Sequence, residues 1–313
     1  MQYLKAPILF MVALAVIFAA FSSHAGQPDF PITSQFDAVT GDYRLSSNSH
    51  HIGIRLIYSS KSRHRGLFGW GWCSDLDAEI KKSESGSHVY RGCELPTADL
   101  VDPREAVKNL RLLADGRMRR VREDGTEQTF DQAGNLISLK SPSGETVTIL
   151  RKNDILLVQA IRTFKVVVDR EHRLVKEIEE LTLEDGVMAG RVWTLRFDGV
   201  FMASFGNETY QYDAFRRMIR RERAVGTPKL ERELVGYRAD GEGIGRFERQ
   251  AASPERRLLV TVRVSEESGK IEIKAERGAE MHPVRIFYDI HLKTLELFGD
   301  RQTARSLLRH LKS

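Results

Sequence analysis

Short runs of alternating apolar and polar residues, divided by turn-forming residues, recur along most of this chain. Because successive side chains of a strand point to opposite faces, this alternation is typical of strands with one buried face. Residues 176–183, KEIEELTL, have helical propensity, but they continue the alternation and are assigned to a strand. The fold class is therefore mainly β. Further strands are predicted at residues 155–160, 164–168, 191–197, 258–264, 271–274 and 284–288.

Turn signals in residues 111–135 indicate that neighbouring strands form hairpins. Asp115-Gly116 and Asp124-Gly125 each follow a short alternating run. An Asp-Gly pair between two such runs is a strong hairpin signal, because the turn needs positive φ values that glycine adopts easily. We expect an antiparallel β-meander, curved into one sheet, across residues 111–299.

Residues 54–72, IRLIYSSKSRHRGLFGWGW, differ from the other runs. Ile54, Leu56 and Tyr58 occupy alternate positions and would share one face of a strand. A polar, basic turn follows, and large apolar and aromatic residues then mix with glycines up to Trp72. The glycines let the backbone bend closely while the rings pack. The pattern predicts a strand, a sharp corner and an aromatic plug; the alternative is an ordinary β-hairpin with an aromatic corner.

This segment combines a strand that carries an arginine and ends in Tyr-Ser-Ser with a Gly-x-Phe-Gly-x-Gly-Trp pattern. The residues of this combination are Arg55, Tyr58, Ser59, Ser60, Gly66, Phe68, Gly69, Gly71 and Trp72. The combination resembles the opening segment of Rhs/YD-repeat proteins. Thr40-Gly41-Asp42 is similar to the sequence that usually precedes that segment in the family.

A short turn unit carries a second resemblance to the same family. Phe130-Asp131 is followed by Gly134 and Leu136, which is similar to the Tyr-Asp-x-x-Gly-Arg-Leu unit of YD repeats. In such a unit the aromatic residue and the leucine pack inward, the aspartate caps the turn and the glycine adopts a left-handed conformation. Asp131 is therefore interpreted as structural.

Three weaker copies of the unit follow. Residues 168–174 keep the aspartate and have His172 at the glycine position. Tyr212-Asp213 is followed by Arg216 at the glycine position and by Met218 at the leucine position. Residues 288–292 keep the Tyr-Asp pair and the leucine. The copies are widely and unevenly spaced, so we interpret them as decayed repeats.

Large members of this family form a hollow β shell around a toxic C-terminal domain, and many carry a self-cleaving Asp-Pro-x-Gly-Leu segment. The present sequence has no such segment. The resemblance therefore implies a binding or scaffold protein without catalytic activity. The partner that it implies is another protein of the envelope or a secreted protein, such as a larger Rhs-type protein.

Residues 1–25 have the features of a signal peptide. Lys5 precedes an apolar run, and Ser23-His24-Ala25 offers small residues for cleavage. A retained anchor is the alternative, although the apolar run is shorter than the roughly 20 residues that span a bilayer. We expect an exported protein, periplasmic or extracellular, without stable membrane insertion after cleavage. Its expected parts are an N-terminal segment at 26–95, a connector at 96–110, the curved sheet at 111–299 and a basic amphipathic helix at 300–313.

Loss of residues 1–25 lowers the formal net charge from +5 to +4, because Lys5 is their only charged residue. Basic and acidic residues are interspersed in the remainder, which argues against a nucleic-acid partner. In an exported protein, Cys73 and Cys93 predict a disulfide that contributes about 3 kcal/mol. The rival is a metal site with His64 and His88, but the spacing gives it no support. We expect neither a metal nor a cofactor.

Arginines are densest in residues 216–223, where they form a candidate site for an acidic protein partner. The alternative is the solvated face of a hairpin that carries acidic residues. A second function class is a carbohydrate-binding module that stacks sugars on exposed Trp70, Trp72 and Trp193. A third is a cell-wall enzyme that uses Asp131 or Asp213, although no catalytic motif is present. The candidate partner-binding residues are Arg216, Arg217, Arg220 and Arg221, opposite Glu222, Glu231 and Glu233.

Overall fold

A computed structural model describes most of the chain between residues 32 and 298. The described ranges are 32–37, 42–47, 55–94, 99–100, 107–184, 187–224, 230–238, 244–250, 258–265, 270–277, 284–289 and 294–298. Most of these residues are in strands; helical structure within them is confined to the short 3-10 helix η2 (Asp75–Asp77) and one turn at 107–108. The predicted mainly β class is confirmed. The predicted signal peptide and C-terminal helix lie outside the described residues.

One antiparallel sheet of 19 strands contains most of the strands of the described residues, and these strands lie in sequence order. This order arises because successive strands turn back and pair, as a β-meander requires. The long strand β18 pairs with both β19 and β20, at different residues. The strands are β11 (Leu110–Leu112), β12 (Met118–Val121), β13 (Glu127–Phe130), β14 (Leu136–Lys140), β15 (Thr146–Lys152), β16 (Ile155–Gln159), β17 (Thr163–Val168), β18 (Val175–Glu184), β19 (Val187–Ala189), β20 (Val192–Asp198), β21 (Phe201–Phe205), β22 (Glu208–Tyr212), β23 (Met218–Ala224), β24 (Leu230–Tyr237), β25 (Ile244–Gln250), β26 (Leu258–Ser265), β27 (Lys270–Arg277), β28 (Val284–Asp289) and β29 (Thr294–Phe298).

All six strands predicted from alternation are present, as β16, β17, β20, β26, β27 and β28. The ambiguous KEIEELTL segment lies in β18, so its assignment to a strand is confirmed. Six strands of the long sheet, β15, β19, β21, β24, β25 and β29, were not predicted individually. β24 and β25 have charged residues on both faces, which conceals the apolar alternation. Pairing with neighbouring strands makes them strands despite their composition.

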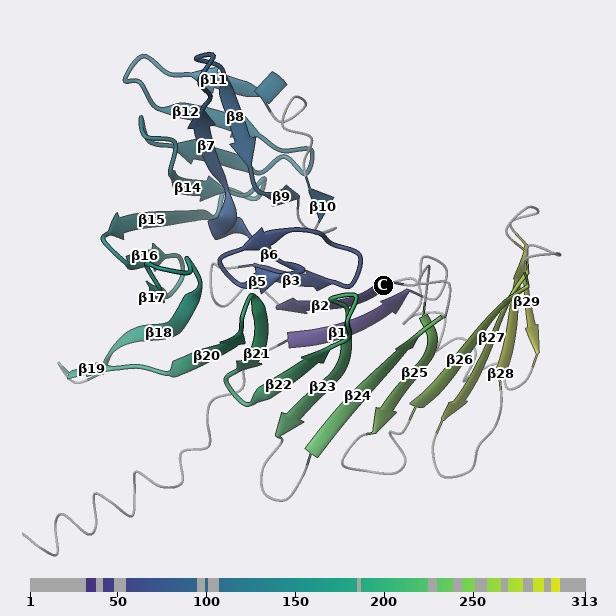
Figure 1. The fold of residues 1–313 in the computed structure, drawn as a ribbon. Coiled ribbons are helices and arrows are strands. Elements are labelled where there is room, and N and C mark those ends of the chain that lie inside the picture. Colours follow the sequence, from purple (N-terminus) through teal and green to yellow (C-terminus); the bar gives the residue numbers. More distant parts are fainter. Residues whose placement is uncertain are drawn as a thin grey trace, which may run out of the picture.

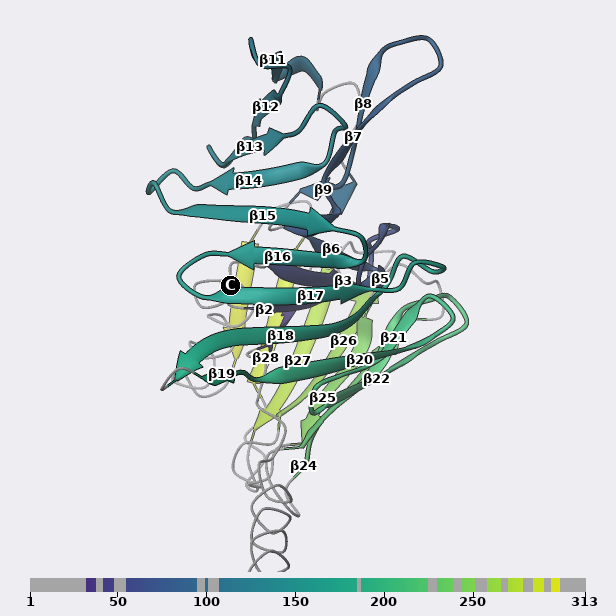
Figure 2. The same cartoon turned by 90° about the vertical axis from the view of Figure 1, so that its left-hand side faces the viewer.

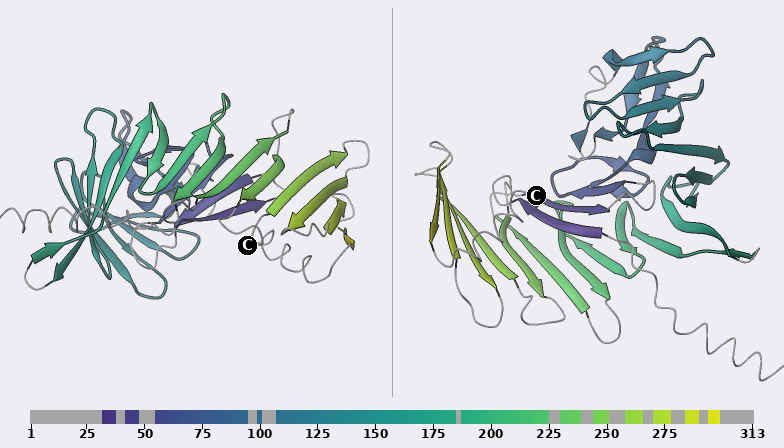
Figure 3. Two further views of the ribbon diagram at one scale, coloured as in Figure 1. Left: turned by 90° about the horizontal axis from the view of Figure 1, so that it is seen from below. Right: turned by 180° about the vertical axis from the view of Figure 1, so that it is seen from behind.

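A smaller sheet lies inside the bend of the long sheet. Its order is β1 (Ile32–Asp37), β2 (Asp42–Ser47), β3 (Leu56–Ser59) and β6 (Trp72–Ser74). We call these four strands the N-terminal sheet. In Figures 1 and 3 they lie beside β22–β25, while β26–β29 continue beyond them. Three two-stranded sheets accompany it: β4 (Arg65–Gly66) with β5 (Gly69–Trp70), β7 (Glu79–Lys82) with β8 (His88–Arg91), and β9 (Cys93–Glu94) with β10 (Asp99–Leu100).

The two large sheets share one hydrophobic core, which extends along the sequence from Ile32 to Phe247. The predicted aromatic plug is at its centre, because Tyr58, Phe68 and Trp72 are completely buried. The rings of Tyr58 and Trp72 contact each other and also contact Tyr212 and Tyr210 of β22. The N-terminal sheet is therefore part of the same packed body as the hairpin series.

Within the described ranges, six hairpin turns repeat the same backbone geometry. In each, the N–H of the first residue donates to the carbonyl of the fifth, and the N–H of the fourth donates to the carbonyl of the first. This is a type I turn followed by one left-handed residue. Four of these turns follow one another between β11 and β15. Figure 2 shows these strands one below another. The six turns begin at Ser83, Leu113, Arg122, Asp131, Ser141 and Asp213.

The turn unit around Asp131 is thus one member of a regular local series, most of whose members have no aromatic-Asp pair. Arg216 has a φ of 69° and takes the left-handed position, as its alignment with the glycine predicts. The alignment of His172 is wrong. The turn after Asp169 is one residue longer, since the Asp169 N–H donates to Leu174, and the left-handed residue is Arg173.

Candidate functional site

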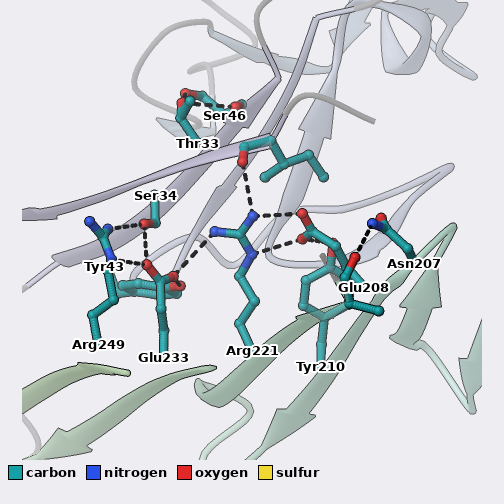
Figure 4. A network of polar contacts seen from close by, with 12 residues as sticks. Thr33, Ser34, Tyr43, Ser46, Asn207, Glu208, Tyr210, Arg221, Glu233 and Arg249 are labelled. Carbon is teal, nitrogen blue, oxygen red and sulfur yellow. Dashed lines mark hydrogen bonds and ion pairs between the residues drawn. The ribbon is translucent and has the colours of Figure 1, made fainter. Parts of the chain in front are cut away.

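Arg221, expected on a partner-binding surface, lies inside the molecule. It is 6% exposed and belongs to β23, where it faces the N-terminal sheet. Its guanidinium makes two hydrogen bonds to Glu208, at 2.7 and 2.6 Å, and one to Glu233 at 3.2 Å. Nη2 also donates to the backbone carbonyl of Ile32 at 2.9 Å, which joins β23 to β1 (Figure 4). The predicted role of Arg221 in binding a partner is therefore corrected to an internal one.

Glu233 of β24 is the second centre of this network. Its carboxylate accepts hydrogen bonds from Tyr43 Oη and Ser34 Oγ, both at 2.6 Å, and from Arg249 Nε at 2.7 Å. Tyr43 and Ser34 are in the N-terminal sheet, whereas Arg249 is in β25. Three contacts join the long sheet to the N-terminal sheet: Arg221 with Ile32, and Glu233 with both Tyr43 and Ser34 (Figure 4). The residues of each contact lie more than 180 positions apart in the sequence. We call Glu208, Arg221, Glu233 and Arg249 the ionic clamp.

The electrostatics of the clamp fix its charges. Burial alone would raise the pKa of Glu233, but Arg221 and Arg249, with the hydrogen bonds from Ser34 and Tyr43, lower it to about 2. Burial raises the pKa of Tyr43 well above its ordinary value, and the negative charge of Glu233 raises it further. Burial acts to lower the pKa of Arg221, yet Glu208 and Glu233 raise it overall. At neutral pH Arg221 and Glu233 are therefore both charged, and Tyr43 is a neutral donor.

The other three arginines of the basic cluster also have internal partners. Arg217 pairs with Asp213 at 2.8 Å and its guanidinium lies 4.0 Å from the ring centre of Tyr237. Arg220 pairs with Glu222. Arg216 lies 4.6 Å from the ring centre of Trp70 and, as an exposed residue, is the member of the four that remains open to solvent.

The residues of the Rhs-like opening segment surround the aromatic plug. Tyr58 Oη accepts the N–H of Met218 at 2.8 Å, and Trp72 Nε1 donates to Tyr212 Oη at 3.2 Å. Arg55 makes two hydrogen bonds to Asp75 at 2.8 and 3.0 Å. The glycines of this segment lie where other parts of the protein approach the backbone closely. Gly66 lies against the Asp77 carboxylate, Gly69 against the Val200 carbonyl and Gly71 against the Tyr58 ring.

Asp131 and Asp213 are both occupied by their own turns. Asp131 Oδ1 accepts the N–H of Asn135 at 2.8 Å, and its two carboxylate oxygens also contact the Asn135 amide. Asp213 Oδ1 accepts the N–H groups of Phe215 and Arg217, both at 2.9 Å. Phe130 and Leu136, which flank the first turn, are completely buried. These contacts match the turn-capping role predicted for Asp131.

The predicted carbohydrate-binding site depends on three exposed tryptophans, and two of them are buried. Trp72 is 0% exposed and Trp193 is 4% exposed, so neither offers a ring face to a sugar. Trp70 is half-buried, and Arg216 lies over its ring. The prediction of a stacking platform formed by these three indoles is therefore wrong.

The predicted disulfide between Cys73 and Cys93 is formed and links β6 to β9. His64 and Asp77 lie beside it, and the potential ligand atoms of His64, Asp77 and Cys93 are within 4.8 Å of one another. The sulfur of Cys93 is committed to the disulfide, and Asp77 is bonded to the N–H groups of Leu67 and Ser74. His88, the other predicted ligand, is exposed on β8 and is not part of this group.

Sequence reasoning missed Glu208, Tyr43, Ser34 and Arg249 as members of the clamp. Glu233 was expected opposite the arginines, and strand register does place it across from Arg221. No local pattern indicates the others, because the contacts of Tyr43 and Ser34 with the clamp span about 200 residues of sequence. An isolated Glu at the start of a strand, as Glu208 is, has the same appearance whether it is buried or exposed.

No family model and no curated protein sequence matches this chain. Among solved structures, one of TcdB2-TccC3 aligns over 86% of this chain and 16% of that chain, with a TM-score of 0.37 and 9% identity. A second, of TcdB2-TccC3-TEV, aligns over the same shares with a TM-score of 0.29 and 11% identity. A bifunctional GH43-CE protein from Bacteroides eggerthii aligns over 86% of this chain and 47% of that chain, with a TM-score of 0.11 and 10% identity. The likeness is weak at these scores and identifies no family for this chain.

Proposed function

We propose that the protein is an exported scaffold of Rhs/YD-repeat type, without catalytic activity, that docks another envelope or secreted protein. The observation that carries this proposal is the open end of the long sheet. The N-terminal sheet lies beside β22–β25, whereas β26–β29 continue past it (Figure 1). Within the described residues β29 is paired on one side only, with β28.

An unpaired edge strand presents a row of backbone donors and acceptors to which a partner can add a strand. Of the two outer strands of the sheet, β29 has five residues and β11 has three. The longer strand offers more backbone hydrogen bonds to an incoming strand, so we assign the docking role to β29. This is a binding mode in which affinity comes from the main chain.

Two further findings support export and the absence of a catalytic role. The disulfide fits an oxidising compartment. The two aspartates considered for catalysis are occupied by their own turns. Separately from these two findings, none of the helical segments among the described residues has the length and hydropathy that a membrane span requires.

The test uses a photo-cross-linking amino acid placed at position 296 of β29, with position 111 of β11 as the matched control. We expect a protein partner to be captured at 296 in cells that express the full chain, and to be identified through a peptide cross-linked to β29. Backbone N–H groups alternate between the two sides of a strand. With the cross-linker kept at 296, one of the two substitutions Thr294→Pro and Leu295→Pro therefore removes a donor from the open edge and leaves the β28–β29 pairing intact.

The proline variant that keeps the wild-type melting temperature should lose the cross-link, because its missing donor faces the partner. Capture at 111 but not at 296 would contradict the assignment to β29. Equal capture by the wild type and by both proline variants would contradict strand addition as the binding mode.

A further inference from the structure

A cleft of about 810 Å³ lies where the opening segment, the β7–β8 hairpin and the meander meet. Its lining contains arginines from four separate elements: β4, β8, β15 and the turn after β17. Two histidines and two carboxylates complete its charged lining. The arginines are Arg65, Arg91, Arg151 and Arg173, and the histidines are His64 and His172.

The two carboxylates of the cleft already have partners. Asp77 has a side chain that is 2% exposed; it accepts the N–H groups of Leu67 at 2.6 Å and Ser74 at 2.8 Å, and lies 3.2 Å from His64 Nε2. Glu79 is shared between Lys81 at 3.2 Å and Arg173 at 3.6 Å. These carboxylates therefore leave little capacity to neutralise the remaining arginines.

Arg65 and Arg91 are exposed, and their side chains make no hydrogen bond or ion pair within the described part of the chain. They are thus oriented by the backbone of short strands and not by an acidic neighbour. A guanidinium group that has no acidic partner within the protein binds carboxylates and phosphates well, because its planar set of N–H donors matches two oxygens at once.

Arg151 adds a third cation whose charge is incompletely compensated. Its Nη2 donates to the Leu76 carbonyl at 3.4 Å, a neutral acceptor. Arg151 is exposed as a residue, but desolvation of its guanidinium lowers its pKa. Asp131 and Glu79 oppose this effect, and the charge of Arg173 adds to it. An anion placed between Arg151 and Arg173 would relieve both the desolvation and the repulsion.

We propose that this cleft is a binding site for a ligand that carries at least two oxyanion groups, either carboxylates or phosphates. One group is held by Arg65 and Arg91, and another by Arg151 and Arg173. The site is separate from the edge strand β29, and its existence does not depend on strand addition there. Its ligand is either a small polyanion or the acidic side chains of a peptide, which present the same chemistry.

The test is isothermal titration calorimetry at low ionic strength with three probes: citrate, pyrophosphate and a hexaglutamate peptide. The variant is the double substitution Arg65→Ser with Arg91→Ser, which removes two arginines that hold no other residue in place. The matched control is Arg111→Ser with Arg196→Ser, two exposed arginines outside the cleft whose side chains also have no partner in the described residues. Both variants change the net charge by the same amount.

We expect one-site binding of at least one probe, at least tenfold weaker in the cleft variant and within twofold of wild type in the control. Added salt should weaken it as well. Binding of hexaglutamate alone would identify the peptide source, and binding of citrate or pyrophosphate the small-molecule source. The proposal is overturned if no probe saturates the protein, or if the control loses as much affinity as the cleft variant.

Discussion

Arg221 is held between two buried carboxylates and a backbone carbonyl, all within 3.2 Å of its guanidinium. Such a side chain does not simply add the energy of its hydrogen bonds. Its desolvation opposes the attraction, whereas its removal leaves two carboxylates buried without compensation. The clamp therefore makes docking of the N-terminal sheet depend on each of its members.

Replacement of Arg221 by alanine should lower the free energy of unfolding by about 3–5 kcal/mol, the usual cost of removing one partner of a buried ion pair. Chemical denaturation followed by tryptophan fluorescence measures this, since Trp72 lies in the same core. Arg216→Ala on the same hairpin is the control. It loses only a contact with the Trp70 ring, so its effect should stay below about 1 kcal/mol. Equal effects of the two substitutions would contradict a clamp centred on Arg221.

The pKa of Glu233 gives the clamp a defined pH dependence. Its value of about 2 is below its ordinary value of 4.5. A carboxylate with a lowered pKa in the folded state stabilises the fold above pH 4.5, and this stabilisation is lost as the pH falls toward 2. We expect a loss on the order of 3 kcal/mol over this interval.

Measurement of the unfolding free energy at intervals from pH 5 to pH 2 tests this prediction. The Glu233→Gln variant should show a shallower slope, because it has no carboxylate to protonate at that position. Glu231→Gln, two residues away on β24, should keep the wild-type slope. A Glu233→Gln profile parallel to that of the wild type would assign the acid sensitivity to other groups.

At the scale of elements, the hairpin turns share one geometry but differ in what surrounds them. Gly134 and Gly144 hold the same left-handed position, with φ values of 86° and 92°. A Cβ on Gly134 would lie 1.8 Å from the Ile80 carbonyl oxygen, whereas a Cβ on Gly144 would meet nothing within 4 Å. The Asp131 turn therefore also packs against strand β7, whose Ile80 N–H donates to the Gly134 carbonyl at 2.8 Å.

Alanine at position 144 should cost about 1–2 kcal/mol, the penalty of a left-handed non-glycine residue. Alanine at position 134 carries the same penalty and also forces β7 away, so we expect about 3 kcal/mol or more. Thermal unfolding of the two variants gives the comparison. If Gly134→Ala is no more destabilising than Gly144→Ala, the β7–β8 hairpin does not rest on this turn.

The disulfide joins strands β6 and β9 across a sequence separation of 20 residues. Its removal by the double substitution Cys73→Ser with Cys93→Ser should lower stability by about 3 kcal/mol, mainly because the unfolded chain regains the freedom of that loop. Denaturation of the oxidised wild type, the reduced wild type and the variant measures the effect. The last two should agree with each other; a reduced wild type as stable as the oxidised form would show that the bond contributes nothing.

Local chemistry accounts for what could be predicted of these elements. Asp-Gly pairs and the Asp131 unit indicate turns because φ and side-chain capping are properties of a few adjacent residues. The same is true of alternation in β16 and β17. It fails for β24 and β25, whose charged residues are paired with neighbouring strands and with the N-terminal sheet. That information is absent from the strand's own sequence.

At the scale of the whole molecule, the sequence predicted a curved meander and a buried aromatic plug, and both are present. It did not predict that the plug belongs to a separate sheet in the bend of the meander. Nor did it predict that Arg221 faces inward. Both depend on contacts between residues about 190 positions apart, such as Arg221 with Ile32. Strand alternation distinguishes the two faces of a strand but does not show which face another sheet will cover.

The central claim is that the N-terminal sheet and β22–β25 form one cooperative body, joined by the ionic clamp, while β26–β29 extend from it as an open end. Amide hydrogen exchange, measured by mass spectrometry on the full chain, tests this most directly. We predict that peptides from β2–β3 and from β23–β24 exchange at one common slow rate, that β29 exchanges faster, and that Arg221→Ala accelerates the two slow groups by the same factor. Exchange of β2–β3 that is faster than that of β23–β24 and unchanged by Arg221→Ala would contradict it.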